Sequence, residues 1–185
     1  MWSFHIDSAA VKVSIVIGKH NVTDWKAIEQ AKERERRSER ERLANVTRRT
    51  EAFAVGLPIL IQNMFDAVVN EVKQNYNDAR SDPGERTRVH FGRDESTLQC
   101  TRAEPHEAEL LLAFLGGAPA DCATLEVHVK GVSSSGQPDG SWGRYHVCCN
   151  SDGAFFFNDL RSGANYLKED QVRAKFMKEF IYFLV

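Results

Sequence analysis

The sequence predicts an α+β fold, in which an antiparallel sheet carries helices on one face. Three observations predict it. Apolar residues recur at helical spacing in the first half, short stretches of alternating polarity follow in the second half, and tight turns join those stretches. The chain has 185 residues, 42% of them hydrophobic and 27% charged, which suits one globular domain spanning 1–185.

The first predicted elements are a strand and a long helix. Residues 11–17 alternate between strongly apolar and more polar positions, as a strand with one buried face does. The helical pattern then runs from Trp25 to about Asp78, and Pro58 predicts a kink or break within it. Near-heptad spacing continues across the proline, at Leu43, Val46, Phe53, Leu57, Leu60, Met64, Val68, Val72 and Tyr76. This spacing suits a helix packed on a sheet or a short coiled coil between two copies.

A charged segment, Glu29–Arg42, precedes this apolar ladder. It holds six basic and five acidic residues, and most arginines have an acid one helical turn away. Because nucleic-acid binding requires uncompensated positive charge, we expect a solvated helix that binds protein and not nucleic acid. We interpret 25–53 as a projecting helical arm and 54–185 as the α+β body, which would include the strand at 11–17. The candidate partner-binding residues are Arg36, Arg37, Arg40, Arg48 and Arg49.

The second half predicts five short strands and two helices. The strands are Thr87–Phe91, Thr97–Cys100, Thr124–Lys130, Trp142–Cys149 and Ala154–Asn158. A flexible loop, Val132–Ser141, separates the third and fourth strands, and Asp152-Gly153 marks a tight hairpin between the last two. Pro105 opens an expected short helix through Leu115. The final helix places Val172, Phe176, Phe180 and Leu184 on one face.

The strands also yield one cluster of reactive side chains. Because successive side chains alternate between faces, the polar face of the sheet would present His90, His128, His146 and Cys148. These four residues are candidate ligands for zinc. Alternatively, Cys148 is a candidate nucleophile with His146 or His128 as its base. The competing interpretation is that the outer face of a one-sided sheet is polar by default, in which case the protein needs no cofactor.

Composition limits where the protein acts. We expect a cytoplasmic protein with reduced cysteines, because no targeting segment is visible and the four cysteines form no paired CxxC motifs. The longest apolar run, Ala52–Ile61, is shorter than a membrane span, so we expect no crossing. The net charge of −2 gives no overall attraction to nucleic acid.

The preferred functional hypothesis is a non-enzymatic protein-interaction or regulatory module. In it, the charged arm and the apolar C-terminal segment Phe180–Val185 engage a partner or a second copy. For that segment, burial in the core is the commoner explanation and a partner-binding surface is the second. The first alternative is a small enzyme or metal-binding protein that uses the His/Cys cluster. The second is an accessory nucleic-acid binder that uses the arginine-rich helix.

Overall fold

A computed structural model describes residues 25–78, 87–104, 106–117, 121–132 and 138–184. The expected strand at 11–17 lies outside these residues. The chain divides into two compact units, Met1–Arg40 and Glu41–Val185. In the first unit, the described residues are helical from Trp25 onward. The second unit holds the sheet and the core, and it is the part of the chain in which a site can be built.

The long helix α1 spans Trp25–Val72 and ends in a π-helical turn, η1, at Lys73–Asn77. The helix continues through Pro58, so the break that the sequence allowed does not occur. Pro58 removes the amide that would bind the carbonyl of Ala54, and both residues lie at the exposed surface, where water can replace that donor. Gly56 is required by packing, because a β-carbon there would lie 2.6 Å from the ring of Phe155.

Six strands form one antiparallel sheet in the order β1-β2-β3-β4-β5-β6, each paired with its neighbour in sequence. The strands are β1 His90–Arg93, β2 Thr97–Arg102, β3 Ala108–Gly116, β4 Cys122–Val132, β5 Pro138–Cys149 and β6 Phe155–Asp159. The predicted α+β class with an antiparallel sheet is therefore confirmed. The predicted tight hairpin between β5 and β6 is also present, and Gly153 adopts a φ of +83° in it.

The helix expected from Pro105 to Leu115 is wrong, because most of this segment forms β3. The leucines, alanines and glutamates of this segment are good helix formers, and for that reason a helix was expected. The same residues also alternate: Ala108, Leu110, Leu112 and Phe114 are buried. Pairing with both β2 and β4 satisfies the backbone of β3, so tertiary context overrides the local helical preference.

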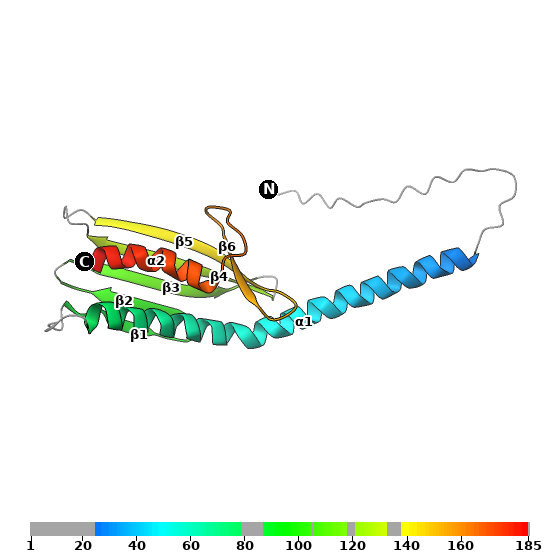
Figure 1. Ribbon diagram of the computed structural model, residues 1–185, viewed down its shortest axis with the longest axis horizontal. Helices are drawn as coiled ribbons and strands as arrows, with labels where there is room; N and C mark the ends of the chain where they lie inside the picture. The colour runs from blue at the N-terminus through cyan, green and yellow to red at the C-terminus, as the bar shows by residue number, and fades with distance from the viewer. Residues whose placement is uncertain (1–24, 79–86, 105, 118–120, 133–137, 185) are drawn as a thin grey trace. The chain divides into compact units, whose positions relative to one another are not determined.

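Helices cover one face of the sheet. The C-terminal helix α2, Glu169–Leu184, and the C-terminal half of α1 lie side by side against the same face (Figure 1). The predicted inward face of α2 is confirmed, since Val172, Phe176, Phe180 and Leu184 are all buried. Met64, Phe65 and Val68 of α1 and alternate residues of every central strand complete one continuous core.

One arginine joins three parts of this core. Arg102, at the end of β2, is only 4% exposed, and its guanidinium lies against the ring of Tyr76. It donates to the hydroxyl of Tyr76 at 2.8 Å and to the carbonyl oxygens of Leu184 at 2.6 Å, Phe183 at 2.5 Å and His106 at 3.1 Å. The last carbonyls of a helix carry partial negative charge and have no partner within the helix, so they suit a buried cation.

By length and composition alone, the helix Trp25–Asn77 could cross a membrane. The core helix of a soluble protein meets the same criterion, and Ile61, Met64, Phe65 and Val68 are buried in the core. Packing against the sheet therefore accounts for part of this apolar character.

We predict that Arg102→Ala lowers the free energy of unfolding by about 3 kcal/mol, because buried oxygen atoms lose a charged donor. Urea denaturation followed by circular dichroism measures the change. The matched control is Arg144→Ala, which removes an exposed arginine paired with Glu126 and should cost less than about 1 kcal/mol. Equal losses in the two variants would contradict the role assigned to Arg102.

Candidate functional site

The face of the sheet opposite the helices is the surface on which the sequence placed its reactive residues. Along β4, and in β5 from Tyr145 to Cys149, residues of one parity are buried and those of the other parity are partly or fully exposed. His128, His146 and Cys148 have the exposed parity, and His90 is exposed on β1. The prediction that these side chains share one face of the sheet is therefore consistent with the structure, and the question becomes how far apart they lie.

Strand register separates the three histidines. His146 lies opposite Thr124, four residues along β4 from His128, which is about 13 Å at the rise of a strand. His90 pairs with Thr101 at the β1 edge, three strand spacings or about 14 Å from β4. Among the described residues, no group of three or more His, Cys, Asp or Glu side chains is placed to hold a metal ion. The structure does not bring the candidate zinc ligands together.

Cys148 lies directly opposite another cysteine, and His146 is two residues away on the same face of β5. Its register partners are Cys122 on β4 and Phe156 on β6. Burial is the main cause that raises the pKa of the Cys148 thiol, and the nearby Cys122 raises it further. A catalytic cysteine that acts at neutral pH needs a lowered pKa, so this environment disfavours the thiolate of Cys148 at that pH. The cysteine-nucleophile alternative thus gains no support from the geometry.

Opposite charges pair across neighbouring strands on this face. Lys130 Nζ lies 3.7 Å from Glu109 Oε2, and Arg144 Nε lies 3.3 Å from Glu126 Oε1. Gln99 also donates to Glu109 Oε1 at 2.8 Å. Such exposed pairs contribute little to stability, but they leave the face with balanced charge.

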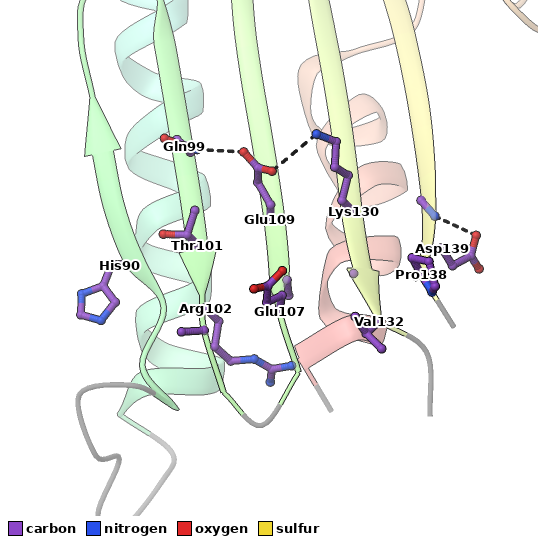
Figure 2. A pocket seen from close by; sticks show the side chains of 14 residues that line it. His90, Gln99, Thr101, Arg102, Glu107, Glu109, Lys130, Val132, Pro138 and Asp139 are labelled. Carbon is purple, nitrogen blue, oxygen red and sulfur yellow. Dashed lines mark hydrogen bonds and ion pairs between the residues drawn. The ribbon is translucent and has the colours of Figure 1, made fainter. Parts of the chain in front are cut away.

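An open groove of about 820 Å³ lies at one end of this face (Figure 2). Its polar lining includes His90, Thr101, Glu107, Glu109, Lys130 and Asp139. The carboxylate of Glu109 is bound by Gln99 and Lys130, and Figure 2 shows the Arg102 side chain extending toward the end of α2. No buried polar side-chain atom of the described residues lacks a hydrogen-bond partner. The groove therefore presents no buried, unsatisfied group to a ligand.

Aromatic and aliphatic side chains remain exposed around the sheet. Trp142 lies 6.1 Å from His128, and Tyr166 lies 5.0 Å from Phe156, measured between ring centroids. Trp142 and Tyr166 are exposed over 42% and 75% of their surfaces. Rings of this kind, amphipathic and held in place by a neighbour, are enriched in protein interfaces.

The candidate partner-binding arginines fall in both units. Arg36, Arg37 and Arg40 belong to Met1–Arg40, whereas Arg48 and Arg49 belong to Glu41–Val185. Arg49 forms an ion pair with Asp121, a buried residue just before β4. The sequence showed no local acid for Arg49, because its partner lies far along the chain. This ion pair ties α1 to the sheet, so Arg49 has a structural role that the sequence did not indicate.

Apolar residues on α1 are exposed just before its buried part. Leu43 and Val46 are 53% and 41% exposed, and they share helical phase with Phe53, which is buried. The stripe that packs on the sheet thus continues beyond the core. By contrast, the C-terminal segment is mostly buried, as the commoner explanation of its apolar character predicts. Phe180, Phe183 and Leu184 lie in the core, and of the described residues 180–184 only Tyr182 is largely exposed.

Comparison with known proteins adds no functional assignment. No protein-family model matches the chain, and no curated protein sequence or solved structure is similar to it. Function must therefore be argued from the surfaces described above.

The most strongly perturbed carboxylate is Asp159, at the end of β6. Burial raises its pKa, but hydrogen bonds from Lys175, Ser162 and Arg161 outweigh burial and hold the pKa well below its ordinary value. Lys175 Nζ lies 2.9 Å from Oδ2, and the amides of Arg161 and Ser162 donate to Oδ1. The hydrogen bonds from Arg161 and Ser162 close the turn that follows β6. The bond from Lys175 attaches α2 to the sheet, so Asp159 stabilises both a turn and the position of a helix.

We predict that Asp159→Asn destabilises the protein at neutral pH and that its difference from wild type shrinks in acid. A carboxyl group with a lowered folded pKa stabilises the fold above its unfolded pKa, about 4, and this contribution is lost as the pH falls through the lower folded value. Urea denaturation of both proteins between pH 7 and pH 3 measures it. A difference that stayed constant over this range would contradict the assignment.

Proposed function

We propose that the protein is a non-enzymatic interaction module that binds another protein chain through the exposed apolar stripe of α1. We name this surface the α1 stripe. It consists of Leu43 and Val46, which lie on the same face of α1 as the buried Phe53. The exposure of Leu43 and Val46, directly before the buried part of the same helical face, is the observation that carries the proposal. A partner helix is the chemistry that fits, because apolar residues at near-heptad spacing on one helical face pack into another helix.

The charged segment Glu29–Arg42 supports the same role. It directly precedes the α1 stripe in the sequence and contains almost equal numbers of basic and acidic residues. Charged residues that flank an apolar seam keep the free helix soluble and select the partner and its orientation. In this proposal Arg36, Arg37, Arg40 and Arg48 act as rim residues, which influence the association rate and its salt dependence more than the affinity.

The apolar surface in this proposal differs from the one that the sequence emphasised. Most of the C-terminal segment is buried in the core and is not available to a partner. Trp142 and Tyr166 offer a second surface, on the open side of the sheet. We assign the main contact to the α1 stripe because it continues the regularly spaced apolar face of α1. The open face of the sheet instead carries paired charges.

The alternatives are weaker on physical grounds. A hydrolytic or metal-dependent enzyme would need a cluster of ligands or an activated nucleophile, and strand register separates the histidines from one another. A nucleic-acid binder would need uncompensated positive charge, and the glutamates of Glu29–Arg42 offset most of its arginines. Retention on a polyanion column at low salt would favour the nucleic-acid alternative.

We predict that the double variant Leu43→Glu/Val46→Glu abolishes association of the full chain, because it places charge where apolar contact is needed. Light scattering of the purified protein, together with identification of co-purifying chains, measures the assembly against the monomer mass of 20.9 kDa. Wild type should exceed this mass or carry a bound partner, and the double variant should return to the monomer.

The matched control is Val55→Glu. Val55 is apolar, lies on α1 and is 71% exposed, but it occupies a different face of the helix from Leu43 and Val46. It should leave the association unchanged, and circular dichroism should show all variants folded. A wild-type protein that is monomeric without a partner at both low and high salt would overturn the proposal. Loss of association in Val55→Glu alone would also do so.

A further inference from the structure

Two cysteines occupy directly opposed positions in the sheet. Cys122 on β4 is the register partner of Cys148 on β5. Residues directly opposite one another in an antiparallel pair have Cα atoms about 4.5 or 5.5 Å apart and side chains on the same face. A disulfide requires a Cα separation of roughly 4.4–6.8 Å. Either kind of antiparallel pair therefore meets this requirement without movement of the backbone.

Both residues of this pair are partly exposed, and Asn158 Nδ2 lies 4.0 Å from the sulfur of Cys148. Both residues have the parity opposite to that of the buried core residues of β4 and β5, so their side chains lie on the face of the sheet that the helices do not cover. A β-carbon at position 117 would lie 3.1 Å from the sulfur of Cys122, so that thiol lies against the bare backbone of Gly117. Glycine at this position provides room beside the sulfur.

The other two cysteines differ in each respect. Cys100 is fully buried on the helix-covered face, and burial raises its pKa to about 12. Cys149 is also buried, and its thiol donates to the carbonyl of Asn150. Because Cys148 and Cys149 are adjacent in one strand, their side chains point to opposite faces. Of the four thiols, only Cys122 and Cys148 combine opposed positions with access to solvent.

We propose that Cys122 and Cys148 are a reversible modification site, at which a low-molecular-weight disulfide such as glutathione disulfide oxidises the two thiols to a cross-strand disulfide. The thiolate of Cys122 attacks one sulfur of glutathione disulfide, forms a mixed disulfide and releases one glutathione thiolate. The thiolate of Cys148 then attacks the Cys122 sulfur and releases the second glutathione. Two protein thiols are oxidised, one glutathione disulfide is reduced to two thiols, and two protons leave the protein.

Burial and neighbouring charges both affect the rate of this exchange, through the pKa values of the two thiols. Burial is the main cause that raises the pKa of both thiols; Asp121 raises it further, and Arg49 opposes this effect. For Cys148, the charges of Cys122 and Cys149 add to the increase. Since only the thiolate attacks, the exchange should be slow at neutral pH and accelerate as the pH rises.

The test uses the full chain incubated with glutathione disulfide at mildly alkaline pH. The expected product has lost two hydrogen atoms and two of its four thiols. Non-reducing proteolysis and mass spectrometry should recover one peptide pair that joins Cys122 to Cys148, and dithiothreitol should reverse the change. A peptide pair containing Cys100 or Cys149, a covalent dimer, or four intact thiols after long incubation would overturn the proposal.

Single serine variants provide the control. Cys148→Ser should stop at the first step and accumulate a glutathione adduct on Cys122, whereas Cys149→Ser should form the disulfide as wild type does. An internal disulfide in Cys148→Ser would show that a different pair reacts and would contradict the assignment. The wild-type peptide map does not depend on the folding of any variant, so it decides the proposal by itself.

Discussion

The buried guanidinium of Arg102 is the interaction on which the rest of the fold depends. It is bound by four oxygen atoms of neutral groups, and two of them are the last carbonyls of α2. The partial negative charge at a helix C-terminus is therefore matched with a cation inside the core. Because Tyr76 belongs to η1 and Arg102 to β2, a single side chain fixes both helices to the sheet at the same end. Asn77 adds to this junction by exchanging two hydrogen bonds with the backbone of Val89.

Two further polar contacts hold the helices elsewhere. Lys175 of α2 binds the buried carboxylate of Asp159, and Arg49 of α1 binds Asp121. With both helices fixed on one face, the opposite face of the sheet has only side-chain pairs between strands to organise it. The exposed surfaces, namely the α1 stripe and the rings around Trp142, are then consequences of a core that is already complete. For this reason we expect partner binding to be separable from folding.

The sequence was sufficient to predict which residues of a strand face the core, but not how far apart residues of different strands lie. Alternation in 124–130 and 142–149 correctly separated buried from exposed residues, because each strand has only two faces. Register follows from loop length, and β5 begins at Pro138, inside the loop expected to end at Ser141. Without the strand order and register, alternation alone could neither pair Cys122 with Cys148 nor give the distances between the three histidines. Arg102 could not be singled out, since its partners lie in distant segments.

Hydrogen exchange, measured by mass spectrometry on wild type and Arg102→Met, tests most directly whether Arg102 joins the helices to the sheet. Methionine has similar length and no donor, so it fills the space without replacing the hydrogen bonds. We expect amides of η1 and of the last turns of α2 to lose protection together, while amides in the β4–β5 ladder keep theirs. Loss of protection confined to β2, or an equal loss throughout the sheet and helices, would contradict the central role of Arg102.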